Sequence, residues 1–244
     1  MAEIVELKDV SFSAQDRNVI QGVSICFERA KITAIIGPSG SGKSTVLKLA
    51  AGLLVPNEGE VFYKGKNIAM MNRNENLEFR REAAFVFQDS ALWANQNLDQ
   101  ILELPLRVHF PQMTKSQRMQ RIKEAAAEAD YKKDLNIRPA RLSMGEQKLI
   151  AFARAMLCNP ELLYLDEWVE SLDETSANKL IEVVKRKKKE GSSIIFVCHD
   201  MRIIRDLADY VVVLVDGKEV FEGTKEDLLN SSELSDYLKM GIAS

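Results

Sequence analysis

A glycine-rich stretch, Gly37-Pro-Ser-Gly-Ser-Gly-Lys43-Ser44, has the spacing G-x-x-x-x-G-K-[ST]. Glycines let the backbone wrap closely, so that successive N–H groups and the positive end of a following helix can face phosphate oxygens. We expect Lys43 to neutralise β- and γ-phosphates and Ser44 to ligate Mg²⁺, a hard cation that prefers oxygen. The predicted phosphate-binding residues are Gly37, Pro38, Ser39, Gly40, Ser41, Gly42, Lys43, Ser44 and Thr45.

Two carboxylates follow the apolar run 162–165 directly. Asp166 stands at the predicted strand end, where it can hold Mg²⁺ through water, and Glu167 can orient and polarise an attacking water. Many strands end in acidic residues, so this pair is informative only because a phosphate-binding loop precedes it. Together the two motifs predict phosphoryl chemistry.

Three further side chains are candidates for this site. His199 follows an apolar run in Phe-Val-Cys-His-Asp, at the strand edge where parallel sheets bind ligands, and can donate to a γ-phosphate. Gln88 ends the run 84–87, and its amide can touch Mg²⁺ or water. Phe12 lies on an early strand, where its ring can stack on adenine or simply pack in the core. His109 lacks such a context and is predicted to be structural.

The elements that must position these residues are visible as continuous apolar runs. Such runs are typical of strands buried on both faces of a parallel sheet, and helical patterns lie between several of them, which favours an α/β layer architecture. The first 30 residues or so and residues 61–64 alternate more and predict antiparallel strands. The continuous runs are 32–36, 84–87, 162–165, 194–198 and 211–215.

The middle of the chain, residues 89–140, has no strong strand pattern. The segment from Thr114 to Gln117 predicts a capping box that opens a helix. The apolar face of that helix would consist of Met119, Ile122, Ala126 and Ala129. We interpret this region as a helical lobe inserted between two parts of an α/β core.

Composition narrows the range of functions. The net charge of −3 over 244 residues lacks the basic excess of a nucleic-acid binder. No signal peptide is visible, and no apolar run reaches the roughly 20 residues that span a bilayer, so a membrane role would depend on a partner. The three cysteines, Cys26, Cys158 and Cys198, are predicted to be buried free thiols of a reducing compartment.

With these motifs in order, the chain resembles the ATP-binding cassette (ABC) subunits of membrane transporters over essentially its whole length. The phosphate loop is followed by Gln88 as the Q-loop and by 142–147 as the signature motif. Asp166 and Glu167 match the Walker B acids, and His199 matches the switch histidine. The remaining match is the D-loop, 171–173, and Phe12 fits the adenine-stacking position.

The resemblance implies a fold and a division of the chain. The fold is an α/β P-loop NTPase, with a RecA-like, mainly parallel core, an antiparallel β subdomain and an inserted α-helical subdomain. Residues 1–244 would form a single ABC ATPase domain. Its nucleotide-binding core would comprise 1–88 and 159–244, its helical subdomain 89–158, and a short C-terminal helical tail 224–244.

The resemblance also implies a mechanism. Glu167, His199 and Gln88 would be catalytic, and Ser44, Gln88 and Asp166 would hold Mg²⁺. Two cassettes would sandwich two ATP molecules head to tail, each between one copy's phosphate loop and the other copy's Ser143, Gly145 and Asp173. Closure would drive transmembrane permease subunits at the cytoplasmic face of the inner membrane, without nucleic acid. The second cassette is expected to be another copy, although pairing with a different cassette stays open.

Substrate class is suggested by two stretches that look like the Mla/Mce-type lipid-transport cassettes: 31–40, and 87–92 followed by 104–109. The ending 237–241 also looks like the tail of that subfamily. We therefore expect phospholipid transport across the envelope, with a periplasmic lipid-binding component as a further partner. Polar amino-acid importers and lipoprotein-releasing or efflux cassettes are the alternatives.

Two residues depart from the family pattern. Met144 replaces the first glycine of Leu-Ser-Gly-Gly-Gln, and it would be strained if that position required a positive φ. Trp168 replaces the usual proline after the catalytic glutamate. Ser143 and Gly145, which would make the direct phosphate contacts, both match. Because Met144 would add a side chain at the interface that closes on ATP, a nucleotide-gated subunit with little hydrolysis is a second hypothesis.

Overall fold

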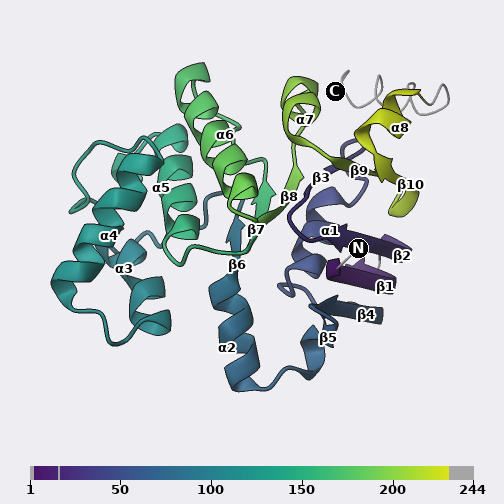
Figure 1. The fold of residues 1–244 in the computed structure, drawn as a ribbon, viewed down its shortest axis with the longest axis horizontal. Coiled ribbons are helices and arrows are strands. Elements are labelled where there is room, and N and C mark those ends of the chain that lie inside the picture. The colour runs from purple at the N-terminus through teal and green to yellow at the C-terminus, as the bar shows by residue number, and fades with distance from the viewer. Residues whose placement is uncertain (1–2, 16, 231–244) are drawn as a thin grey trace.

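The computed structural model describes residues 3–15 and 17–230. Within that part, the central layer is a six-stranded sheet in the order β10-β9-β3-β8-β7-β6, parallel except for the β9–β10 pair (Figure 1). Its strands are β3 (Ile32–Ile36), β6 (Ala83–Val86), β7 (Leu162–Asp166), β8 (Ser193–Val197), β9 (Tyr210–Val215) and β10 (Lys218–Thr224).

The five continuous apolar runs are confirmed as the five parallel strands of this sheet. Every residue of β3, β7 and β8 is buried, which is why these strands show no alternation in the sequence. Because parallel strands end at the same edge, the residues that follow β3, β7 and β8 are brought together there.

A second sheet is antiparallel, as the alternating N-terminal pattern predicts. Its order is β2-β1-β4-β5, and α1 packs with it and the central sheet around a shared apolar cluster. These elements are β1 (Glu3–Ala14), β2 (Arg17–Glu28), β4 (Glu58–Tyr63), β5 (Lys66–Asn67) and α1 (Lys43–Ala50).

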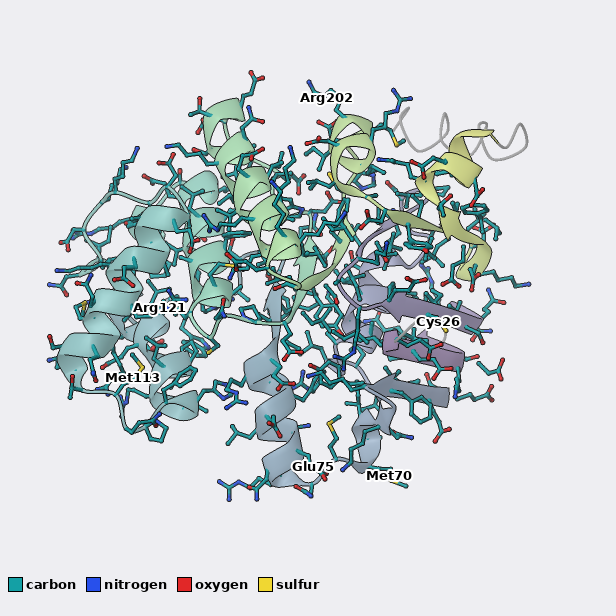
Figure 2. The ribbon with its side chains drawn as sticks, viewed as in Figure 1. Cys26, Met70, Glu75, Met113, Arg121 and Arg202 are labelled. Carbon is teal, nitrogen blue, oxygen red and sulfur yellow. The ribbon has the colours of Figure 1, made fainter. Side chains whose placement is uncertain are left out.

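Helices of the middle segment stand to one side of the central sheet (Figure 1). The helix predicted after Thr114 is confirmed, with Thr114 Oγ1 accepting from Gln117 N at 3.3 Å, and Ile122 and Ala126 buried. Arg121 of the same helix donates to the C=O groups of Met156 and Leu157 at the end of α5 (Figure 2). The helices and 3₁₀ turns before β7 are η1 (Ile68–Met70), α2 (Arg73–Glu82), α3 (Leu98–His109), α4 (Lys115–Glu128), η2 (Pro139–Arg141) and α5 (Met144–Met156).

Three helices follow β7: α6 (Glu174–Lys189), α7 (Met201–Leu207) and α8 (Lys225–Asn230). The predicted helical tail, 224–244, therefore coincides with α8 at its start, and 231–244, with the 237–241 ending, lies outside the described residues. In the part of the chain that the structure describes, each helix is too short or too polar to pass through a bilayer.

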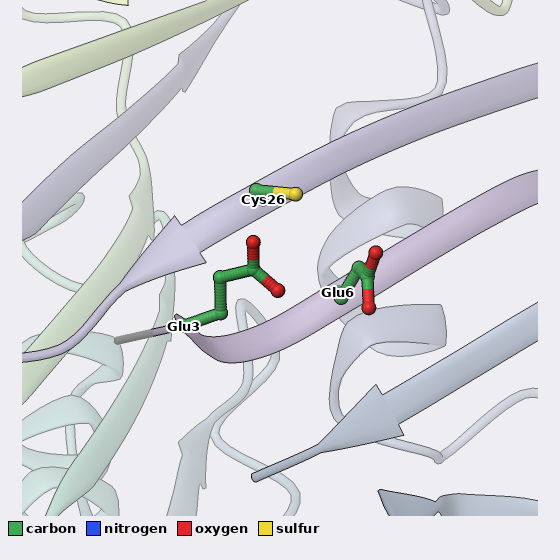
Figure 3. Close-up of side chains that lie close together, drawn as sticks. All are labelled: Glu3, Glu6 and Cys26. Atoms are coloured by element: carbon green, nitrogen blue, oxygen red, sulfur yellow. The ribbon is translucent and has the colours of Figure 1, made fainter. Parts of the chain in front are cut away.

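The prediction that all three cysteines are buried is wrong for Cys26. Inward and outward positions alternate on β2, so Cys26 is exposed between buried Ile25 and Phe27, and it faces Glu6 and Glu3 of β1 (Figure 3). Partial burial of the thiol and the nearby Glu3 raise the pKa of Cys26 to about 11. All three cysteines are free thiols. Cys198 is buried as expected, whereas Cys158 is only partly buried.

Candidate nucleotide site

The predicted phosphate loop connects β3 to α1, which begins at Lys43. Gly37 has a φ of 145°, and a Cβ there would lie 2.0 Å from the C=O oxygen of Leu214. Gly42, with a φ of 95°, caps the helix, and a Cβ there would lie 2.5 Å from Ile20 Cδ1. Only glycine fits both positions, because a side chain would be strained and would clash.

Lys43 lies inside the curl of this loop. Its ammonium donates to the C=O groups of Gly37 and Pro38, each at 2.9 Å, and burial lowers the pKa of Lys43 while Glu167 and Asp166 oppose that shift. Among the described residues, the buried hydroxyl of Ser41 is one of two buried side-chain polar atoms without a hydrogen-bond partner. The loop therefore presents a cation and a free hydroxyl to any anion that it encloses.

Asp166 ends β7 beside the start of α1. Ser44 Oγ donates to Asp166 Oδ1 at 2.8 Å, and the aspartate is 1% exposed. Burial raises the pKa of Asp166, and the hydrogen bond from Ser44 works against that rise. Two hard oxygen donors thus lie side by side next to the phosphate loop, which is a donor set suited to Mg²⁺.

Glu167 follows with a φ of 45°, a backbone conformation that is uncommon for a residue with a side chain. Its Oε1 lies 3.1 Å from His199 Nε2. Burial, together with Glu170 and Asp166, raises the pKa of Glu167 to about 7, while burial and then Lys43 lower the pKa of His199. The pair is therefore a near-neutral proton acceptor held by an imidazole that favours its uncharged form.

Gln88 follows β6 and its side chain is exposed. Its Nε2 donates to Glu170 Oε2 at 3.4 Å, so in this structure the amide points to the loop after Glu167. A pocket of about 740 Å³ lies here, lined among others by Gln88, Asp166, Met144 and Lys148. Within the described residues, no hydrogen bond joins the Gln88 side chain to Ser44 or Asp166.

The signature segment opens α5. Ser143 Oγ accepts from Glu146 N at 3.2 Å, and Glu146 Oε2 accepts from Ser143 N at 3.0 Å, which forms a capping box. Met144 occupies the first helical position, is 73% exposed, and is not among the positive-φ residues. The methionine is therefore unstrained here.

Gly145 is the position where the backbone approach is close. A Cβ there would lie 2.8 Å from the C=O oxygen of Ser171, in the segment that leads to α6. Asp173 caps α6 by accepting from Ser176 N at 3.0 Å. The segments 142–147 and 171–173 are thus neighbours in one chain, and among the described residues no hydrogen bond joins Ser143, Gly145 or Asp173 to the phosphate loop.

Phe12 lies on β1, where it pairs with Ile20 of β2, the residue whose side chain leaves no room for a Cβ at Gly42. The ring is partly buried against the apolar cluster around α1. Phe12 is therefore placed near the phosphate loop, and both adenine stacking and core packing stay open for it.

Trp168 and Lys148 have contacts that the sequence did not reveal. Trp168 is fully buried and its ring stacks on Phe152 of α5, with centroids 5.8 Å apart. Lys148 of α5 is 3% exposed and hydrogen-bonds to the backbone at Gln88 and Glu167. The only available signal for Lys148 was a cation one turn into the signature helix.

Comparison with known proteins decides the family. The sequence pattern described as ABC transporter matches residues 20–170 of this chain. The chain belongs to the ABC transporter family. As an ABC cassette it is the ATP-hydrolysing, nucleotide-binding subunit of a membrane transporter, with the expected P-loop NTPase fold.

Individual proteins that resemble this ABC cassette support the same family. The phospholipid transport ATP-binding protein MlaF of Haemophilus influenzae is 32% identical over 95% of this chain and 88% of its own length. The nickel import ATP-binding protein NikE of Escherichia coli O157:H7 is 32% identical over 93% of this chain and 87% of its own. The dimeric post-hydrolysis structure of the cassette MJ0796, bound to ADP and Pi, has a TM-score of 0.83, 28% identity, and 91% and 98% coverage.

Proposed function

We propose that this ABC cassette powers the transport of phospholipid across a cell envelope. The observation that carries the proposal is the end-to-end similarity to MlaF, whose name gives an intermembrane phospholipid transport system. The stretches 31–40, 87–92 and 104–109 point to the same subfamily. Nickel import is the second candidate, because NikE is equally identical over almost as much of the chain.

For ATP binding, we assign residues 37–45 to the phosphates and Phe12 to adenine. Lys43 would exchange the C=O groups of Gly37 and Pro38 for phosphate oxygens, and the unpartnered Ser41 hydroxyl would gain an acceptor. Ser44 and Asp166 would hold Mg²⁺, with Gln88 reaching the same site after moving away from Glu170. When bound, Mg²⁺ supplies charge neutralisation at the β- and γ-phosphate oxygens.

For hydrolysis, we assign the proton acceptor to Glu167. A carboxylate with a pKa of about 7 accepts a proton from water more readily than an ordinary glutamate does, and its base form is present at neutral pH. The Nε2 atom of His199 lies 3.1 Å from Glu167 Oε1, where its single N–H can orient the carboxylate. With ATP bound, the same N–H would instead donate to a γ-phosphate oxygen. These roles need both side chains on the carboxyl edge of the parallel strands, where β7 and β8 end.

The assembly that we propose has two cassettes and at least one permease. The starts of α5 and α6 bring together Ser143, Gly145 and Asp173. In a head-to-tail dimer, these residues of one copy would face the ATP bound by the other copy. The core, 1–88 and 159–244, would bind ATP, and the helical subdomain, 89–158, would contact the permease. The complex would sit at the cytoplasmic face of the inner membrane and act with a periplasmic lipid-binding component.

The test is to purify the cassette with its membrane partners and reconstitute the complex in proteoliposomes. We expect ATP-dependent transfer of labelled phospholipid, and loss of at least about 100-fold in hydrolysis for Glu167→Gln, in line with removal of a general base. Nickel uptake without lipid transfer would replace the phospholipid proposal by the second candidate. Hydrolysis that survives Glu167→Gln would contradict the assignment of the base.

A further inference from the structure

A buried lysine on α5 contacts both sides of the nucleotide site. Lys148 is 3% exposed, and its ammonium donates to the C=O of Gln88 and, at 3.1 Å, to the C=O of Glu167. These two carbonyls belong to different segments, one after β6 and one after β7. A buried ammonium needs such acceptors, so the two hydrogen bonds fix where both segments can lie relative to α5.

The same helix holds both segments at a second point. Phe152, one turn after Lys148, stacks on Trp168, the residue after Glu167. Arg154 donates to the C=O groups of Ser90 and Ala91, and we call residues 88–91 the Gln88 segment. α5 thus contacts Glu167 and Trp168 on one side and the Gln88 segment on the other.

The backbone that α5 contacts includes residues in energetically unfavourable conformations. Glu167, Ser90 and Ala91 have φ values of 45°, 63° and 46°. Such conformations cost on the order of 1 kcal/mol or more each, and they persist when surrounding contacts over-determine them. The hydrogen bonds from Lys148 and Arg154 are contacts of that kind, because they act on the carbonyls of these same residues.

We propose that Lys148 is a positioning residue, which holds the backbone of Glu167 in register with the Gln88 segment and so lets α5 set the position of the catalytic carboxylate. The inference rests on the proposed role of Glu167. In a head-to-tail dimer, Ser143, which caps α5, would lie beside the partner's ATP, and Lys148 lies about one turn into that helix. The nucleotide of one site would thereby influence the base of the other.

The test compares Lys148→Met and Lys148→Arg in the purified complex, with Lys132→Met as the control for loss of a lysine. The Lys132 side chain is 75% exposed and pairs with Asp130, so its removal takes away a lysine charge without touching the backbone of Gln88 or Glu167. For Lys148→Met we expect kcat to fall by about 10- to 100-fold and KM to change less than about 2-fold, because a displacement near 1 Å costs rate rather than affinity. Lys148→Arg should recover most of the rate.

The alternative is that Lys148 only supports folding. That role predicts a lower melting temperature with weaker ATP binding, or no change in kcat, and either result overturns the proposal. If Lys148→Met does not fold, Lys148→Gln, which keeps an uncharged N–H donor group, gives the same comparison. The readout is hydrolysis, so the inference stands or falls independently of whether the cargo is phospholipid or nickel.

Discussion

At the scale of single residues, the site is organised by burial around Glu167. Glu167 is 8% exposed, lies beside Glu170 and Asp166, and has its pKa raised to about 7. Charged carboxylates are poorly solvated in such a place, so ionising Glu167 costs free energy, which nearby cations, water and phosphate can offset. A pKa shift of this kind also makes the stability of the nucleotide-free protein depend on pH.

The sign of that dependence follows from linkage. The pKa of Glu167 is raised in the folded state above its unfolded value near 4.5, so its contribution to stability is complete at low pH and is lost as pH rises through about 7. Glu167→Gln removes the titrating group. We compare the free energy of unfolding of the variant with that of the native protein. We expect this difference to shift in favour of the variant by about 1–3 kcal/mol as the pH rises from 5 to 8.

Thermal unfolding of the nucleotide-free protein and of Glu167→Gln at the two pH values measures this gain. Equal differences in melting temperature at pH 5 and pH 8 would contradict the raised pKa. Glu170→Gln is a useful comparison, because removing a neighbouring carboxylate should lower the pKa of Glu167 and reduce the pH dependence.

At the scale of elements, the strands were predictable and several contacts of the helices were not. β3, β7 and β8 are buried on both faces, so their sequences are uninterrupted apolar runs. α2 buries only Phe79 among its described residues, and so polar a helix has little periodicity to detect. Lys148 escaped prediction because its partners are backbone carbonyls, which carry no residue-type signal.

The same limit applies to the candidate site. Ordered motifs identified Lys43, Ser44, Asp166 and Glu167, and the structure brings Ser44 to Asp166 and His199 to Glu167. The Gln88 amide, which we expected beside Ser44 and Asp166, donates to Glu170 in the structure. This contact depends on how two segments distant in sequence pack together. The buried stack of Trp168 on Phe152 likewise needs the position of α5 relative to β7.

The start of α5 yields a prediction about the departure from the family pattern. Met144 is exposed and helical, whereas a side chain at Gly145 would press on the Ser171 carbonyl at 2.8 Å. We expect Met144→Gly to change kcat for ATP by less than about 3-fold and to cost at most about 1 kcal/mol of stability. Gly145→Ala should destabilise by about 1–3 kcal/mol through the clash and lower hydrolysis at least 10-fold.

Steady-state hydrolysis and chemical unfolding, measured on both variants, test whether Gly145→Ala has the larger effect on activity and stability. A large gain of activity in Met144→Gly would show that the methionine limits the native enzyme, and would favour the hypothesis of a nucleotide-gated subunit. Gly145→Ala behaving like the native protein would contradict the close approach of α5 to the segment before α6.

At the scale of the whole molecule, the two groups of residues that we propose for ATP lie at separate places in one chain. The phosphate loop, Asp166, Glu167 and His199 meet at the carboxyl edge of the parallel strands, and the start of α5 lies among the helices beside that sheet (Figure 1). A helix start with free N–H groups favours an anion, but α5 can supply that only to a nucleotide bound elsewhere. ATP should therefore join two copies.

This arrangement predicts that ATP and not ADP drives dimer formation, most visibly when hydrolysis is blocked. Glu167→Gln should retain ATP because the phosphate loop and Lys43 are intact, so with Mg²⁺ and ATP it should pass from monomer to dimer by light scattering. Adding Gly145→Ala to Glu167→Gln should weaken that dimer by about 10-fold or more, because the partner's contact is displaced while ATP binding at the phosphate loop is unchanged. A stable dimer without nucleotide, or a double variant that dimerises as strongly as Glu167→Gln, would mean that α5 does not meet the partner's ATP.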